Sequence, residues 1–160
     1  MRKFFGCFTG ALALMVLLSS QASAQTLTAN LNGGEETPAA LNTGMWGTVE
    51  VGVDQVNNEV SVTLRVFNVP TATTAGHIHV GAKGTGGPTI LNFPPSLVGR
   101  SGDFAMTFRL GDTPGVFNPR PAQGINTIED AIQAILGGNT YVNVHTSQNP
   151  GGEIRGQLTR

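Results

Sequence analysis

All three histidines of the chain lie in two short segments that alternate between apolar and polar residues. His77 and His79 belong to the segment 75–81, and His145 belongs to the segment 141–146. Residues two apart in a β-strand share a face, so His77 and His79 are expected to point the same way. Neutral imidazole is a good ligand for both copper and zinc. This pattern predicts a metal site at His77, His79 and His145.

Other polar residues are predicted to share the histidine face. Apolar Val142 and Val144 are expected in the core, which places the residues between and after them on the outer face of their strand. Apolar Ile154 is also expected in the core, which places Glu153 and Arg155 on the outer face of the last strand. If the three segments are neighbours in one sheet, a single outer face carries His77, His79, Asn143, His145, Glu153 and Arg155.

The residue types leave several uses open for the histidines. Hydrogen bonds to Asn143, Thr146 or Glu153 would brace the loops 81–88 and 147–152, which is a purely structural use. A metal ion is a second use, and a pH-sensitive or ligand-binding role is a third, because imidazole serves all of these. A neighbouring arginine would disfavour a cation and attract an anionic ligand.

The first 24 residues are predicted to be a secretory signal. Basic Arg2 and Lys3 precede an apolar run over 4–18, and small residues lead up to a cleavage site after Ala24. The run is shorter than the roughly 20 residues that a membrane span needs, so we expect a secreted or periplasmic protein with no membrane span after cleavage. The one cysteine, Cys7, lies in this segment, so residues 25–160 offer no thiol for a disulfide, a nucleophile or a thiolate metal site.

Length and charge restrict what residues 25–160 can do. They have the size of one domain. Seven scattered basic residues stand against ten acidic ones, a formal charge of −3, so nucleic acid and anionic membranes are poor partners. Glu35 and Glu36 are adjacent, and neighbours on a strand point to opposite faces, so they form no paired-carboxylate site. The sequence predicts no catalytic residue and no certain cofactor.

Most of the chain alternates with a period of two, which predicts strands. The stretches 49–53 and 60–66 flank the turn 54–58 and predict a hairpin, and 103–110 predicts a further strand. Shorter candidates are 26–32, 77–80, 89–91, 140–146 and 153–158. About eight short strands separated by Gly, Pro and Asn turns indicate an all-β antiparallel fold, an immunoglobulin-like sandwich or Greek-key barrel.

One segment has the period of a helix. Apolar residues at i, i+3, i+4, i+7 and i+8 from Ile128 predict an amphipathic helix over about 127–136, docked on one end of the core. Asn126 is the expected N-cap, with Glu129 three residues on, and Gly137-Gly138 marks the end of the helix.

Three parts of the chain together resemble the CHRD (chordin) domain family. They are the opening 27–38, the central His-Ile-His at 77–79 with its glycine-rich sequel, and the closing 141–158 with its Asn-Pro-Gly-Gly-Glu-Ile-Arg-Gly-Gln run. The likeness covers nearly all of 27–158 and identifies a microbial, secreted, single-domain member. It implies an immunoglobulin-like β domain outside the cytoplasm, an interaction role in animal proteins and no established catalytic activity. We therefore expect a non-enzymatic module whose polar patch binds an extracytoplasmic protein, a glycan or a metal ion.

The segment Gly76-His77-Ile78-His79 is also similar to the copper-binding strand of Cu,Zn superoxide dismutase. That family needs six histidines, an aspartate and a disulfide, whereas this chain has three histidines. The count excludes the two-metal site. It leaves a mononuclear copper or zinc site at His77, His79 and His145, with copper-dependent redox activity, as the alternative function.

Overall fold

The computed structural model of this protein describes residues 24–111 and 113–160. All but the last residue of the predicted signal segment 1–24 lies outside the described residues, so the predicted cleavage stays a prediction. Within the described part, no helix is long and apolar enough to cross a membrane.

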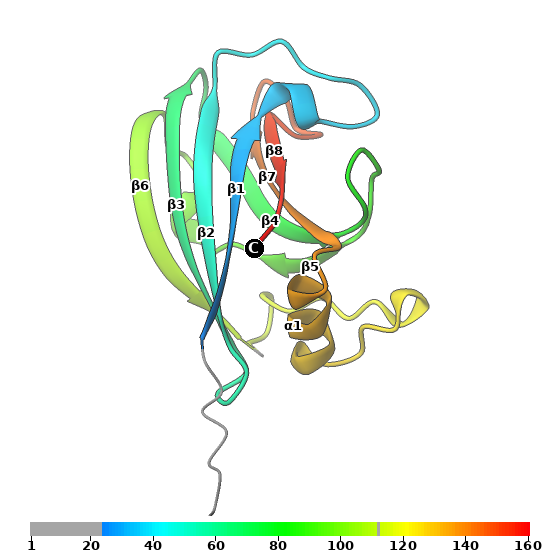
Figure 1. The fold of residues 1–160 in the computed structure, drawn as a ribbon. Coiled ribbons are helices and arrows are strands. Elements are labelled where there is room, and N and C mark those ends of the chain that lie inside the picture. Colours follow the sequence, from blue (N-terminus) through cyan, green and yellow to red (C-terminus); the bar gives the residue numbers. More distant parts are fainter. Residues whose placement is uncertain (1–23, 112) are drawn as a thin grey trace, which may run out of the picture.

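Eight antiparallel strands form one sheet that curls until it nearly closes into a barrel (Figure 1). Their order across the sheet is β5-β4-β7-β8-β1-β2-β3-β6. The predicted all-β antiparallel fold with one docked helix is confirmed. The strands are β1 (Gln25–Asn32), β2 (Trp46–Asp54), β3 (Glu59–Val69), β4 (Thr73–Val80), β5 (Thr89–Asn92), β6 (Gly102–Leu110), β7 (Thr140–Thr146) and β8 (Ile154–Gln157).

The hairpin of β2 and β3 follows directly from the alternation of valines. Val53 pairs with Val60, and the inward residues along both strands are almost completely buried. Asp54 closes the turn because its Oδ1 accepts the backbone N–H groups of Val56 and Asn57. Asn58 then adopts a left-handed backbone with φ 53°, which asparagine tolerates better than most residues.

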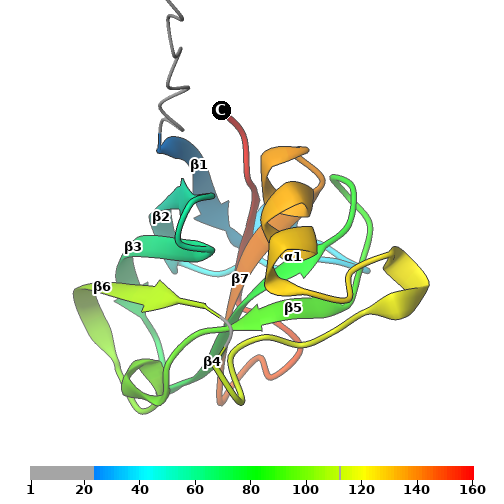
Figure 2. The ribbon, with the colours of Figure 1, turned by 90° about the horizontal axis from the view of Figure 1, so that it is seen from below.

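The core lies inside the barrel, and helix α1 (Ile128–Leu136) covers one end of it (Figures 1 and 2). The apolar stripe of α1 belongs to the same cluster of buried residues as the inward side chains of the strands. On β6, Phe104, Met106 and Phe108 point toward the core, as predicted. They are only half-buried, because β6 is an edge strand.

The two edge strands approach each other through side chains and a loop. The rings of Phe93, just after β5, and Phe108 of β6 pack edge to face with centroids 4.8 Å apart. The backbone of 116–118 adds hydrogen bonds along the free edge of β5, from Asn92 N to Val116 O and from Asn118 N to Ile90 O. These contacts fill the gap between β5 and β6, the two edge strands, which no ladder of backbone hydrogen bonds joins.

The helix begins one residue later than its predicted cap implies. Thr127, not Asn126, is the N-cap: its side chain accepts from the backbone N–H of Asp130, whose carboxylate accepts in return from Thr127. Asn126 contributes only its backbone N–H, which Asp130 also accepts. Both residue pairs fit the capping-box spacing, and the backbone conformation of Thr127 decides between them.

Replacing Thr127 with alanine is therefore expected to lower the free energy of unfolding by about 1 kcal/mol, because it removes the capping oxygen. Replacing Asn126 with alanine keeps the backbone N–H and is expected to cost less than about 0.5 kcal/mol. Urea denaturation of the two variants measures both values. Equal losses for the two would contradict the assigned cap.

Candidate metal centre

The pairing of β4, β7 and β8 brings the predicted site residues together. In one row across the sheet His77 is opposite Asn143, and Asn143 is opposite Arg155. In the neighbouring rows His79 is opposite Tyr141, and His145 is opposite a small residue of β4. The histidine side chains thus leave the sheet on the face away from the core, since Ile78 between them is fully buried on the other face.

The three imidazoles converge on one point. One ring nitrogen of each histidine lies within 4.8 Å of those of the other two. His77 Nδ1 and His145 Nε2 are 3.0 Å apart. Metal–nitrogen bonds are roughly 2.0–2.1 Å long, so two nitrogens on one ion lie up to about 4 Å apart. The nitrogens that are farthest apart would therefore have to approach by about 1 Å or less to share one ion.

The surroundings orient two of the rings for ligation. His79 Nδ1 lies 2.9 Å from the carbonyl oxygen of Gly87, and His145 Nδ1 lies 2.9 Å from that of Pro150. A carbonyl only accepts, so a ring that donates this hydrogen bond carries its proton on Nδ1 and has its lone pair on Nε2. A hydrogen bond from the second ring nitrogen to a carbonyl is the usual support of a metal-ligating histidine.

Asn143 lies between the histidines and Arg155. Its Oδ1 lies 3.0 Å from His79 Nε2. This oxygen and the carbonyl oxygen of Gly87 are both acceptors, and a neutral His79 has one N–H, so the ring donates to one of them at a time. When the proton is on Nδ1, the Asn143 amide would turn away and leave Nε2 to an ion.

Burial keeps all three histidines neutral. It is the main cause that lowers the pKa of each ring. The pKa of His77 falls to about 4, because repulsion from a protonated His145 or His79 adds to the effect of burial. Rings that are neutral at pH 7 are in the form that binds a metal.

The remaining polar residues of the predicted patch do not reach the surface. Asn143, Glu153 and Arg155 are 4%, 1% and 1% exposed, because the loops 33–45, 81–88 and 147–152 cover this face of the sheet (Figure 1). Asn143, Glu153 and Arg155 cannot make the contact surface expected for a macromolecular partner. Their role is to hold the covering loops and the histidines in place.

Arg155 connects two of these loops to the sheet. Its guanidinium donates to Thr37 Oγ1 at 2.8 Å and to the carbonyl oxygen of Thr85 at 2.7 Å. Its Cζ also lies 3.4 Å from the ring centroid of Tyr141, a cation–π contact. The Tyr141 ring stacks on His79 in nearly parallel planes, 4.7 Å apart. Arg155, Tyr141 and His79 thus form a stack of planar groups, which holds the His79 ring in position.

Glu153 connects the third loop. Its carboxylate accepts hydrogen bonds from Thr43, Thr146 and Asn149. Burial by itself would raise the pKa of Glu153, but these three hydrogen bonds outweigh it and lower the pKa. The ionised carboxylate therefore holds the loops 33–45 and 147–152 against β7.

Glu36 is a part of the site that the sequence did not reveal. Glu35 forms a surface ion pair with Lys83, whereas Glu36 is only 9% exposed. Burial raises the pKa of Glu36 to about 7, although the charge of Arg155 opposes this. Gly152 packs so closely on the carboxylate that a Cβ there would lie 2.7 Å from both oxygens. The adjacency of two glutamates at the start of a loop gave no signal for this burial.

The raised pKa of Glu36 predicts a pH dependence of stability. Between pH 4.5 and about pH 7 the folded state binds more protons than the unfolded state, so this contribution is complete below pH 4.5 and is lost as the pH rises through about 7. The Glu36→Gln variant, which stays neutral, should gain stability relative to the parent as the pH rises from 5 to 8. Thermal unfolding measured across this range tests it, and a constant difference between the two proteins would contradict it.

The comparisons with known proteins agree with this architecture. The model of the CHRD domain family matches residues 27–158, which include every strand except the first two residues of β1. No curated protein and no solved structure matches the chain. The match covers the histidine strands, the covering loops and the closing Glu153–Arg155 segment alike. The chain therefore belongs to the CHRD domain family.

Proposed function

We propose that this CHRD domain is a non-enzymatic metal-binding module that holds one Cu(II) ion through His77, His79 and His145. The observation that carries the proposal is the convergence of three neutral imidazoles, two of which donate from the opposite nitrogen to a backbone carbonyl. This arrangement places Nε2 of His79 and of His145 on one face of the sheet. Without an ion, His77 Nδ1 donates to His145 Nε2, so His77 becomes the third ligand by moving its proton to its other nitrogen or by turning its ring.

The donor set favours copper over other common ions. Neutral nitrogen ligands suit Cu(II) and Zn(II), while Ca(II) and Mg(II) require oxygen ligands. The two nearby carboxylates do not belong to the donor set, because Glu153 already accepts three hydrogen bonds from the covering loops and β7, and the high pKa of Glu36 favours its neutral form. Among divalent ions of the first transition row, Cu(II) binds most tightly to such ligands.

The purely structural reading has support as well. His79 and His145 each bind a carbonyl of a covering loop, so they brace the loops 81–88 and 147–152 even without an ion. The two roles are compatible, because the carbonyls occupy Nδ1 while the ion would take Nε2 of both rings. The experiment must therefore distinguish the loss of a bound ion from the loss of the hydrogen bonds that hold the two loops.

Membership of the CHRD family and the predicted signal over 1–24 support an extracellular or periplasmic location for this module. In such a compartment we expect the domain to carry the Cu(II) ion as its bound ligand. Among the residues that the structure describes, none form a paired acid and base at the site, so we infer binding rather than hydrolytic catalysis.

Titration of the purified protein with Cu(II) and Zn(II), followed by calorimetry and copper EPR, tests the proposal. We expect one ion per chain and an EPR spectrum with nitrogen hyperfine structure. The His77→Ala/His79→Ala double variant and His145→Ala should each weaken Cu(II) binding by more than about 100-fold, because losing a ligand costs more than losing its supporting group. A dismutase assay of the copper-loaded protein then tests the redox alternative.

Lys83→Ala is the matched control, since Lys83 lies in the covering loop 81–88 with its side chain exposed. This variant should bind Cu(II) like the parent. Circular dichroism and thermal unfolding identify variants that have lost their fold. A folded parent protein that binds neither ion, or folded histidine variants that bind as tightly as the parent, would overturn the proposal and leave the histidines as braces of the loops.

A further inference from the structure

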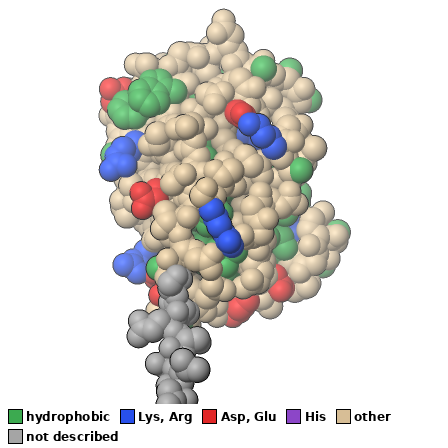
Figure 3. Space-filling model, viewed as in Figure 1, with side chains coloured by type: hydrophobic (Ala, Val, Ile, Leu, Met, Phe, Trp, Pro, Cys, Tyr) green, Lys and Arg blue, Asp and Glu red, His purple; other side chains and the backbone are tan. Residues whose placement is uncertain are grey.

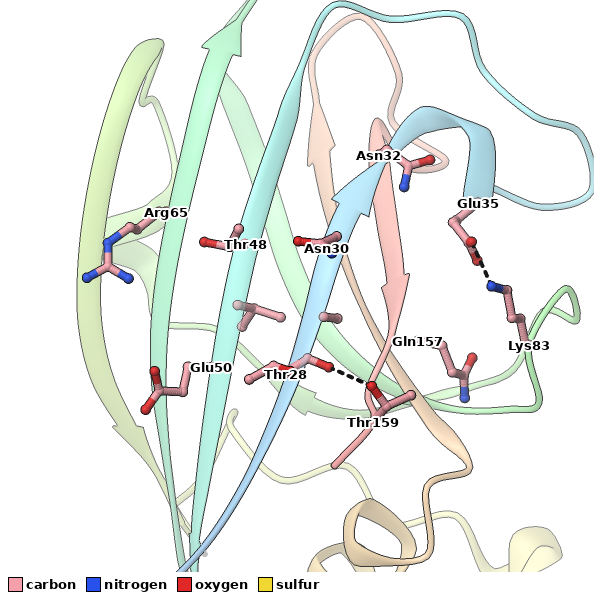
Figure 4. A pocket seen from close by; sticks show the side chains of 12 residues that line it. Thr28, Asn30, Asn32, Glu35, Thr48, Glu50, Arg65, Lys83, Gln157 and Thr159 are labelled. Carbon is pink, nitrogen blue, oxygen red and sulfur yellow. Dashed lines mark hydrogen bonds and ion pairs between the residues drawn. The ribbon is translucent and has the colours of Figure 1, made fainter.

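A groove of about 650 Å³ lies on the outer face of the barrel, over β1, β2 and β8 and apart from the histidines (Figure 4). Asn30 and Asn32 of β1 and Thr48 and Glu50 of β2 line it, together with Gln157 of β8. Figure 4 shows these side chains standing out from the sheet, with an ion pair between Glu35 and Lys83 at one edge. The groove thus offers amide and hydroxyl groups in a row across neighbouring strands.

An exposed tryptophan lies beside this groove, next to its lining residue Asn32. Trp46 belongs to the same outward row of β2 as Thr48, and it is 46% exposed. Figure 3 shows that this face of the molecule carries a large hydrophobic patch at its upper left. One face of its ring is covered by Phe67 of β3, with centroids 4.2 Å apart. On its other side Trp46 is paired with Asn32 of β1.

The ring face of Trp46 away from Phe67 lies on the side of the groove. This follows because β1 and β3 lie on opposite sides of β2, so that face is on the side of β1 and its asparagines. Stacking on Phe67 restricts the orientation of the ring. Such a preorganised aromatic wall beside hydrogen-bonding side chains is the arrangement in which a flat, partly apolar ligand is held by its ring and oriented by its polar groups.

The charges around the groove favour a neutral ligand. Glu35 is paired with Lys83, and Glu50 and Arg65 contribute one charge of each sign. The lining therefore has no excess charge that would select an anion or a cation. Amides and hydroxyls, which both donate and accept, are suited to the hydroxyl groups of a sugar.

We propose that this groove binds a neutral oligosaccharide. A pyranose ring stacks its C–H face on Trp46, whose π-face is electron-rich, and its hydroxyls hydrogen-bond to Asn32, Asn30 and Thr48. The groove continues from Thr48 across Asn30 of β1 to Gln157 of β8, which provides room for further sugar units (Figure 4). This site is separate from the proposed metal centre and does not depend on it.

Trp46 is the only tryptophan of the chain, so its fluorescence reports on the groove directly. The purified protein is titrated with cellohexaose, xylohexaose and mannohexaose, and binding is measured by the fluorescence of Trp46 and by calorimetry. We expect saturable binding of at least one hexasaccharide. By calorimetry, Trp46→Ala should weaken it by about tenfold or more, as for aromatic anchors in other binding sites, whereas Trp46→Phe should keep most of the affinity.

Val98→Ala removes an exposed apolar side chain elsewhere and serves as the control, while Asn30→Ala tests the polar floor of the groove. Val98→Ala should bind like the parent and Asn30→Ala should bind more weakly. Addition of a chelator should change nothing, which separates this result from the metal titration. No binding of any of the three sugars by the folded parent, equal binding by a folded Trp46→Ala variant, or binding of a heparin hexasaccharide alone would each overturn the proposal.

Discussion

The architecture of this domain depends on two buried charges within the chain's closing motif. Glu153 and Arg155 flank the first residue of β8 on the face away from the core, and both are 1% exposed. A charge removed from water is strongly destabilising unless hydrogen bonds and opposite dipoles replace its hydration. The covering loops supply those groups, namely hydroxyls, an amide and backbone carbonyls. The loops are therefore held by the charges that they bury.

The burial of these charges determines the chemistry of the histidines. The same loops that enclose Arg155 and Glu153 also cover His77, His79 and His145, and this burial lowers their pKa values. The carbonyl oxygen of Pro150 further places the proton of His145 on Nδ1, and that of Gly87 can accept from Nδ1 of His79. A set of solvent-exposed histidines on a bare strand would have neither the neutral charge state nor the fixed tautomer that a ligand site needs.

The two proposed sites use different stretches of the outer surface of one curved sheet. The core takes up the inward face of every strand, so the outward face is free to vary. Across β4, β7 and β8 this face is buried under loops and gathers imidazoles, whereas across β1, β2 and β3 it is open and gathers amides, hydroxyls and one aromatic pair. The short strand β8 separates the two regions, with Arg155 directed to the first and Gln157 lining the second.

The amino-acid sequence by itself determined the local features of this protein. Alternation of valines predicts the hairpin of β2 and β3, the bounds of β7 are those read from the sequence, and the shared face of His77 and His79 follows from strand geometry. Only the tertiary structure decided which strands are neighbours, because β4 and β7 pair although His77 and His145 are 68 positions apart. It also decided that Glu36 is buried while Glu35 is not, and that Thr127 caps the helix instead of Asn126. The physical reason is that periodicity records which side of a strand a residue occupies, whereas burial and pKa depend on what distant segments pack against that side.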